Sequence, residues 1–241
     1  MLRHFIPRND KAGFTLAEVL ITLVIIGIIA ALTIPNLLQK YQEQATVKKV
    51  QKFYSNLSNA YSLAIKENGP ANEWGLVINS EESAIKVYEL IFKPYFKIAK
   101  DCGTTNIGNC ITNDYYKYRD NTNARKGNGR VYYKIALEDG TAVWFRSGSG
   151  NTRAEIYIYF DVNGVKGPNV YGEDLFVFFI AKDKVFPSGN KSGEYSIYPF
   201  VPYCTNKSYG YGCTAWVIYK GNLDYLHCDD LTWDSRSCKE K

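Results

Sequence analysis

One ionisable side chain, that of Glu18, interrupts an apolar stretch of 21 residues from Phe14 to Ile34. A helix of this length covers roughly 30 Å, the thickness of the hydrocarbon core of a bilayer. A carboxylate inside a membrane-spanning helix costs about 2.5–3.5 kcal/mol to insert, and less near the interface. Glu18 therefore needs a compensating partner, and an acid in such a segment is by default a candidate functional residue.

A second group of side chains that could do chemistry lies in residues 161–174, between two apolar segments. Four of them offer carboxylate or amide oxygens: Asp161, Asn163, Asn169 and Asp174. Oxygens of this kind, completed by backbone carbonyls, hold calcium in proteins, so the loop is a candidate calcium site. The alternative is a turn whose side chains cap their own backbone. The loop departs from the EF-hand pattern, because Gly167-Pro168 stands where an acid should and Lys166 lies inside it.

Six cysteines fall into three close pairs: Cys102 and Cys110, Cys204 and Cys213, and Cys228 and Cys238. If the domain lies outside the cytoplasm, three short disulfide loops are the simplest of the 15 possible pairings. Zinc is not favoured, because no Cys-x-x-Cys pair occurs and the chain has only two histidines, His4 and His227. Catalysis by Cys228 with His227 is not favoured either, because neighbours in sequence rarely face each other.

Composition and motifs point away from an enzyme and from a nucleic-acid-binding protein. The net charge of +5 is mild, and no Gly-x-Ser-x-Gly motif or phosphate-binding glycine loop occurs. The tyrosines and basic residues of 115–130 could contact DNA by stacking and phosphate pairing. Tyrosine also suits half-exposed strands and subunit interfaces, and we favour that interpretation. Apart from calcium, no cofactor is predicted.

The elements that position these residues begin with a helix of about 50 residues. After Pro35, apolar residues recur at steps of three and four as far as Ile65, whereas lysines lie largely off that stripe. The outer half of the helix is therefore amphipathic, and Asn68-Gly69-Pro70 is a stop signal. A second helix is predicted over 81–92, directly after Ser80.

Strand periodicity begins near residue 130. Residues 131–137 and 141–145 flank Glu138-Asp139-Gly140, and Asp-Gly between two β-rich runs is a strong hairpin signal. One long helix followed by antiparallel strands predicts an α+β fold. Further strands are predicted at 154–160, 175–180 and 215–219.

The segment Gly13-Phe14-Thr15-Leu16-Ala17-Glu18, with a basic leader before it and an apolar run after it, resembles the amino terminus of type IV pilins and type II secretion pseudopilins. The resemblance implies that a prepilin peptidase cuts between Gly13 and Phe14 and that the new amino group of Phe14 is methylated. It also implies that Glu18 serves assembly. In a filament, the Phe14 amine of a neighbour would neutralise the buried carboxylate and fix the axial register between subunits.

Gly27 and Pro35 match the same family and are predicted, with Glu18, as assembly residues. The resemblance implies that residues 27–35 are helical in the free subunit and lose helicity in the filament, which would make them the extensible part of the subunit. The alternative is a simple bend, since proline removes one helical hydrogen bond.

The resemblance also implies a domain organisation and an architecture. The architecture is a pilin-like roll, in which a helical spine packs on an antiparallel sheet with disulfide-bonded loops. The family contains subunits that bind calcium in loops of the globular domain. The predicted parts are a basic leader that is removed (1–13), a transmembrane and filament-core helix (14–35), the amphipathic half of the spine helix (36–68), and a globular domain (69–241) with an αβ-loop region (69–130) and a sheet with carboxy-terminal loops (131–241).

The function that this resemblance implies is that of a structural subunit of a type IV pilus-like filament. Its partners would be identical and related pilin subunits, the prepilin peptidase, and a pilus or type II secretion assembly platform. Arg3, Arg8 and Lys11 would hold the amino end in the cytoplasm, with the globular domain outside the cytoplasmic membrane and later in an extracellular pilus or a periplasmic pseudopilus. The alternatives are a secretion pseudopilin, a minor or tip pilin acting as adhesin or DNA-uptake receptor, and an unprocessed single-pass membrane-anchored binding protein.

Overall fold

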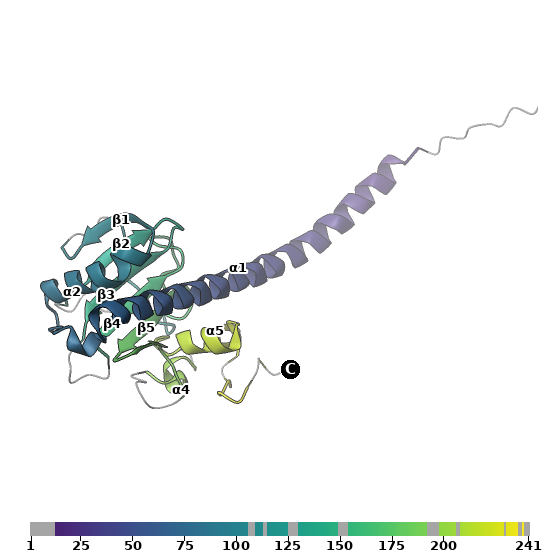
Figure 1. Cartoon of the computed structure of the whole chain (residues 1–241). Helices are drawn as coiled ribbons and strands as arrows, with labels where there is room; N and C mark the ends of the chain where they lie inside the picture. The colour runs from purple at the N-terminus through teal and green to yellow at the C-terminus, as the bar shows by residue number, and fades with distance from the viewer. Residues whose placement is uncertain are drawn as a thin grey trace, which may run out of the picture. The chain divides into compact units, whose positions relative to one another are not determined.

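The chain folds as an α+β protein with one long helix and one antiparallel sheet, as predicted (Figure 1). It divides into two compact units, Met1–Gln42 and Glu43–Lys241. Helix α1 (Leu16–Asn68) contributes to both units and ends at the predicted stop signal. The computed structural model describes residues 13–105, 109–112, 115–124, 130–148, 154–191, 198–205, 208–228, 230–235 and 238.

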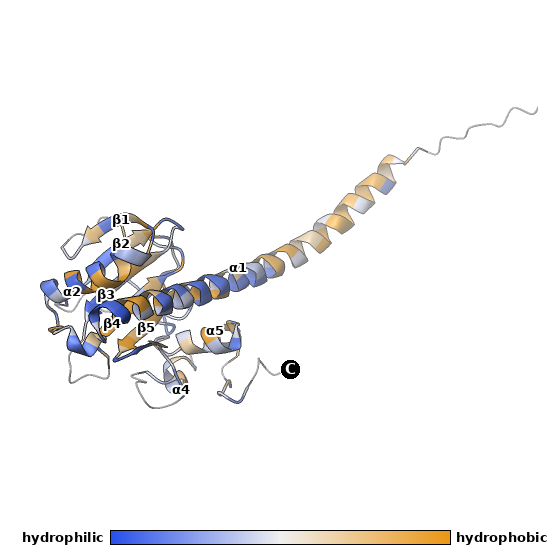
Figure 2. Ribbon diagram, viewed as in Figure 1, coloured by the Kyte–Doolittle hydropathy of each residue, from blue (hydrophilic) through white to orange (hydrophobic). Residues whose placement is uncertain are grey.

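In the first unit, α1 is mostly apolar from Leu16 to Ile34, with Glu18 as its one charged residue (Figure 2). Its large apolar side chains are more than two-fifths exposed from Leu16 to Tyr41. The helix is long and apolar enough to cross a membrane, by length and composition. A continuous exposed apolar surface of this extent marks contact with lipid or with other protein.

In the second unit, α1 is amphipathic and buries one stripe against the sheet. Phe53 stacks on Phe160 with ring centroids 4.0 Å apart, which fixes the helix on the strands. The Tyr61 hydroxyl accepts from the Ala71 N–H at 3.0 Å and so holds the chain where it leaves the helix. The stripe confirms the predicted period and consists of Val47, Val50, Phe53, Leu57, Ala60, Tyr61 and Ala64.

The second predicted helix, over 81–92, is confirmed. Ser80 caps it, because the Ser80 hydroxyl accepts from the Ser83 N–H at 3.2 Å. Phe92 stacks on Phe145 of the sheet with centroids 4.2 Å apart. The region contains η1 (Ala71–Glu73), α2 (Glu81–Val87), the π-helical η2 (Tyr88–Phe92) and α3 (Lys93–Tyr95).

Among the described residues, six antiparallel strands form one sheet whose order follows the sequence. The predicted Asp139-Gly140 hairpin joins β2 to β3, and Gly140 has a φ of +80°, which glycine adopts without strain. The edge strands β1 and β6 were not predicted, because β1 is largely polar and exposed and β6 is only four residues long. The strands are β1 (Ile98–Gly103), β2 (Tyr133–Leu137), β3 (Ala142–Ser147), β4 (Ile156–Asp161), β5 (Leu175–Ala181) and β6 (Lys184–Pro187).

Both faces of the sheet are covered. Alternate residues such as Val143 and Phe145 join the core beneath α1, whereas Trp144, Tyr157 and Tyr159 lie on the opposite, outer face. Loop tyrosines pack over that outer face, which explains why the central strands are apolar throughout. These loop residues are Tyr116, Tyr118, Tyr171, Tyr198 and Tyr211.

The strand predicted at 215–219 is wrong, because this segment is helix α5 (Thr214–Lys220). Its β-branched and aromatic residues favour a strand locally. Tertiary contacts override that preference: the Thr214 hydroxyl accepts from the Val177 N–H at 2.9 Å, and Gly221, with a φ of +71°, caps the helix end. The other carboxy-terminal elements are α4 (Phe200–Tyr203) and η3 (Asp224–Leu226).

The six cysteines form three disulfides that close short loops: Cys102–Cys110, Cys204–Cys213 and Cys228–Cys238. Each such bridge typically contributes about 2–4 kcal/mol of stability. Since Cys228 is in a disulfide, it is not a thiol nucleophile. Its neighbour His227 instead places Nε2 2.9 Å from Glu43 Oε1 and so ties the carboxy-terminal loop to α1.

Candidate functional site

Glu18 and Thr15 form a reciprocal cap at the start of α1. The Thr15 N–H and the Thr15 hydroxyl each donate to Glu18 Oε2 at 2.8 Å, and the Glu18 N–H donates to Thr15 Oγ1 at 3.2 Å. This arrangement is a capping box, which satisfies two of the unpaired N–H groups at a helix start. The Thr-x-x-Glu spacing is its sequence signature, and sequence reasoning about Glu18 had overlooked it.

Gly13 and Phe14 precede the helix in non-helical backbone. Phe14 is 88% exposed, so the Gly13–Phe14 peptide bond is accessible in the subunit by itself. The leader residues Arg3, Arg8 and Lys11 lie outside the described residues. The capping box begins one residue after Phe14, which places Glu18 one helical turn from the amine that cleavage would create.

Gly27 and Pro35 both lie inside α1, which is helical throughout 27–35. Pro35 has no N–H to donate to the carbonyl of Ala31. Nearby side chains add local bonds to carbonyls: the Thr33 hydroxyl donates to Ile29 O at 2.9 Å and the Asn36 amide donates to Leu32 O at 3.4 Å. The extension of 27–35 in a filament stays a prediction.

The 161–174 loop brings its two aspartates together in the interior. Asp174 Oδ2 accepts from the Asn169 N–H at 2.8 Å and from Asn163 Nδ2 at 3.2 Å, and Asp174 Oδ1 accepts from the Val170 N–H at 2.7 Å. Asp161 Oδ1 accepts from the Asn163 N–H at 3.1 Å. These bonds match the turn-capping alternative, in which the side chains brace their own loop.

Two observations in the same loop fit a cation. Asn163 Oδ1 and Asn169 Oδ1 are buried and lack a hydrogen-bond donor among the described residues, and Asn169 is only 8% exposed. Burial, followed by the nearby Asp174 charge, raises the pKa of Asp161 to about 8, and burial also raises the pKa of Asp174. Two buried carboxylates and two amide oxygens without donors are the ligand chemistry of a hard cation such as calcium. No third acid, histidine or cysteine joins such a group among the described residues.

Tyr116 and Tyr118, two of the tyrosines that could contact DNA, pack against other aromatic rings. Tyr116 is buried on the outer face of the sheet, where its ring lies 4.8 Å from that of Trp144. Tyr118 packs against Tyr209 with centroids 4.9 Å apart. Arg125 and Lys126 lie outside the described residues. The buried Tyr116 ring is not available to stack on bases, whereas Tyr115 is 50% exposed.

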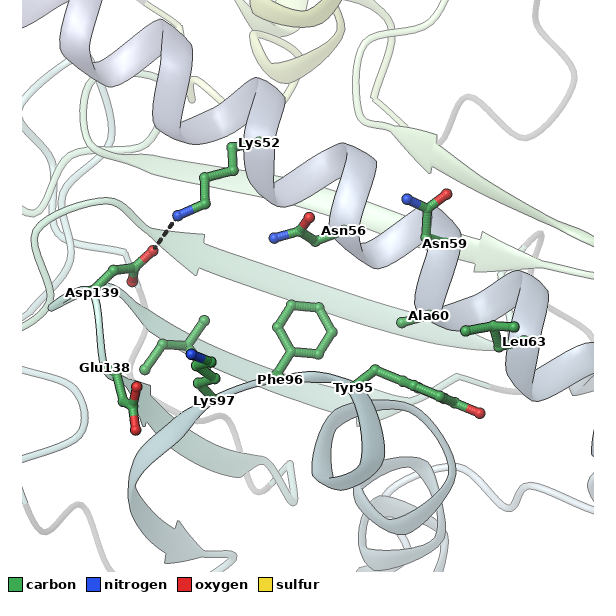
Figure 3. A pocket seen from close by; sticks show the side chains of 11 residues that line it. Lys52, Asn56, Asn59, Ala60, Leu63, Tyr95, Phe96, Lys97, Glu138 and Asp139 are labelled. Atoms are coloured by element: carbon green, nitrogen blue, oxygen red, sulfur yellow. Dashed lines mark hydrogen bonds and ion pairs between the residues drawn. The ribbon is translucent and has the colours of Figure 1, made fainter.

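An open groove runs between α1 and the segment that precedes β1 (Figure 3). Its volume is about 690 Å³, and its lining mixes amides, charges and rings, with Asn56 and Asn59 on the helix side and Phe96 opposite. Lys52 and Asp139 lie 3.5 Å apart across it. Both side chains are exposed, and an exposed pair of this kind contributes about 0–1 kcal/mol. None of the predicted site residues lines this groove.

Comparisons with known proteins agree with this geometry. Residues 8–34 match the prokaryotic N-terminal methylation motif. Type II secretion system core protein G of Aeromonas hydrophila is 38% identical over 71 residues, which are 29% of this chain and 49% of that protein. The chain therefore matches about half the length of this relative. No solved structure matches.

The methylation motif, the long apolar helix and the antiparallel sheet define a protein of the type IV pilin and pseudopilin class. Residues 36–214, which are 179 of the 241, match a family of unknown function (DUF6613), and the chain belongs to that family.

Proposed function

We propose that this chain is a structural subunit of a type IV pilus-like filament, is cut between Gly13 and Phe14 by a prepilin peptidase, and assembles through α1. The observation that carries the proposal is the exposed apolar part of α1, with a single acid in its first turn. Such a surface needs lipid before assembly and other helices after it. Its role is assembly rather than catalysis.

Glu18 sets the axial register between neighbouring subunits in the proposed filament. In the separate subunit the capping box with Thr15 satisfies the carboxylate. In the filament, the cationic Phe14 amine of a neighbouring subunit pairs with Glu18 in surroundings of low dielectric constant. An unpaired charge there is costly and a paired one is not, so the contact fixes the axial register of neighbouring helices.

The membrane and the secretion machinery complete the proposed cycle. The basic leader keeps the amino end in the cytoplasm, and the disulfide-bonded unit lies on the other side of the cytoplasmic membrane. The filament then incorporates identical and related subunits on a pilus or type II secretion platform. The globular units form its outer surface in a pilus outside the cell or a pseudopilus in the periplasm.

Filament recovery tests the proposal. Filaments sheared from cells that produce the protein should contain it by mass spectrometry and be visible by electron microscopy. Deleting the prepilin peptidase should leave the protein in the membrane fraction and abolish its recovery in filaments. Recovery of the full-length chain from membranes, with the leader intact in peptidase-competent cells, would instead indicate the unprocessed single-pass binding protein.

A secretion pseudopilin is the second candidate, and the match to type II secretion system core protein G favours it. The two candidates differ in where the filament forms. A pseudopilin mutant should lose secreted enzymes and release no filaments on shearing, whereas a pilus mutant should lose filaments and keep secretion. A minor or tip pilin that acts as adhesin or DNA-uptake receptor would be present in few copies per filament.

We also propose that the 161–174 loop holds calcium through Asp161, Asn163, Asn169 and Asp174. The donor-free amide oxygens support this proposal. Calcium would neutralise the two carboxylates and stiffen the loop. Calorimetric titration of the full chain in detergent should show heat for the wild type and for Asp183→Asn, an exposed control, but none for Asp161→Asn. The absence of heat in the wild type would leave the loop as a self-capped turn.

A further inference from the structure

Arg146 is a cation buried on the outer face of the sheet. It lies two residues after Trp144 in β3 and pairs across the sheet with Tyr157 of β4, both of which belong to the outer-face cluster. Arg146 is only 5% exposed. Its guanidinium carbon lies 3.7 Å from the centre of the Tyr157 ring, which is within cation–π distance.

The polar contacts of Arg146 leave it under-satisfied. Nη1 donates to the carbonyl of Ser147 at 3.2 Å, and the guanidinium also hydrogen-bonds the Tyr159 hydroxyl. Nε is buried and has no hydrogen-bond partner among the described residues. In the part of the chain that the structure describes, no carboxylate lies within ion-pairing distance of the guanidinium. The cation therefore has the Tyr157 ring, the Tyr159 hydroxyl and one carbonyl as neighbours, but no described counter-charge.

Lys134 on β2 is a second buried cation on the same face, and its ammonium group has hydrogen-bond acceptors. It is buried to a similar degree, and its Nζ donates to the carbonyls of Thr104 at 2.6 Å and of Tyr132 at 3.0 Å. Burial lowers the pKa of Lys134, so this side chain can lose its proton and become neutral more easily than an exposed lysine. An arginine cannot do so, because its guanidinium stays protonated in proteins.

Further groups surround Arg146 with donors for an anion. Arg130 is exposed and interacts electrostatically with Tyr159 and Tyr198, the two tyrosines that also interact with Arg146. Burial raises the pKa of both tyrosines, so each keeps its hydroxyl proton and can donate it. These interactions link Arg146 with a second cation and two phenol groups of the outer-face region.

We propose that Arg146, with Arg130 and the hydroxyls of Tyr159 and Tyr198, binds an oxyanion, the carboxylate or phosphate group of a small ligand. A buried charge needs a partner, and an oxyanion would supply the acceptor that Nε lacks. A guanidinium binds carboxylate and phosphate through paired hydrogen bonds, and the tyrosine rings offer a surface for the rest of the ligand. This inference does not depend on filament assembly.

Thermal unfolding of the full chain in detergent, at constant ionic strength, tests the site. The probes are inorganic phosphate, glucuronate as a carboxylate-bearing sugar, and glucose as its uncharged counterpart. We expect a saturable rise in the melting temperature with phosphate, with glucuronate or with both, and none with glucose. The anion that raises the melting temperature identifies the kind of oxyanion that binds. If neither phosphate nor glucuronate raises it, the inference is wrong.

Variants separate the site from general charge effects. Arg146→Gln should abolish the anion response, and Lys184→Gln, which removes an exposed cation from β6, should keep it. Equal responses in the two variants would contradict the assignment. If Arg146→Gln does not fold, Arg130→Gln, which changes an exposed residue, tests the same site. Its anion affinity should fall about tenfold, because one charge-assisted contact is lost. If Arg130→Gln leaves the anion affinity unchanged, Arg130 is not part of an anion site and the proposed site is wrong.

Discussion

At the scale of single residues, the environment of each carboxylate decides what it does. Glu18 caps a helix in the apolar unit, whereas Asp161 and Asp174 share the interior of one loop. The sequence shows all three acids, and it places Glu18 in a recognisable motif. It does not show that Asp161 is fully buried or that two asparagine oxygens lack donors, because those facts depend on how the loop folds back on β4 and β5.

The first prediction concerns pH. The pKa of Asp161 is about 8 in the folded chain and near 4 in the unfolded chain. The folded state therefore holds the proton more tightly, so the stabilising contribution is complete below about pH 4 and is lost as the pH rises towards 8. Without calcium, the free energy of unfolding should fall by up to about 1.4 kcal/mol per pH unit in this window.

Chemical denaturation at a series of pH values, with a chelator present, measures that slope. Asp161→Asn should flatten it, and the exposed Asp183→Asn should leave it as in the wild type. Added calcium should raise stability more at pH 8 than at pH 5, because calcium requires ionised carboxylates. A slope that Asp161→Asn leaves unaltered would show that other groups govern the pH dependence.

The second prediction concerns Glu18. Glu18→Ala should leave insertion into the membrane intact, because it removes a charge from an apolar helix. If the proposed pairing holds, the substitution should reduce incorporation into filaments, because the Phe14 amine of a neighbouring subunit would lose its partner. Quantitative immunoblots of membrane and sheared fractions measure both effects. Glu67→Ala, at the exposed far end of α1, is the matched control and should assemble normally.

At the scale of elements, the structure depends on contacts that local sequence does not show. The helices over 16–68 and 81–92 and four strands were predictable, because their periodicity and stop signals are local. Helix α5 was not, because its Val217, Ile218 and Tyr219 favour a strand while Thr214 and Gly221 fix a helix. The Thr15 to Glu18 cap was predictable in principle from its spacing.

The third prediction tests the end of α5. Gly221 has a φ of +71°, in the left-handed region that a side chain disfavours. Gly221→Ala should lower the free energy of unfolding by about 1 kcal/mol, and Gly221→Asn by less, because asparagine tolerates this conformation. Urea denaturation of the two variants measures the difference. An equal loss in both would mean that the cap geometry is not what the substitution disturbs.

The fourth prediction concerns the joint between α1 and the sheet. Phe53 is buried and stacks on Phe160, so Phe53→Ala should cost about 3–5 kcal/mol and loosen the second unit. Ser55→Ala, on the exposed side of the same helical turn, should change stability by less than about 0.5 kcal/mol. Comparable losses in both variants would contradict the packing of α1 on the sheet.

At the scale of the whole molecule, the apolar surface and the polar candidate sites lie in different units. The first unit carries the apolar surface, the methylation-motif segment and Glu18, and its class was predictable because its motif is contiguous. The second unit carries the disulfides, the aspartate loop and the arginine and tyrosine cluster. The outer-face cluster could not be predicted, because Tyr157 of β4 and Tyr198 of a loop join it only after the strands and loops fold over one another.

The amino-terminal mass of the assembled protein tests the central claim most directly. Mass spectrometry of the protein from sheared filaments or, for a pseudopilin, from the membrane should find a chain that begins at N-methylated Phe14 and retains Glu18. The same preparation from a strain without prepilin peptidase should begin at Met1. A chain that begins at Met1 in peptidase-competent cells would contradict processing and assembly through α1.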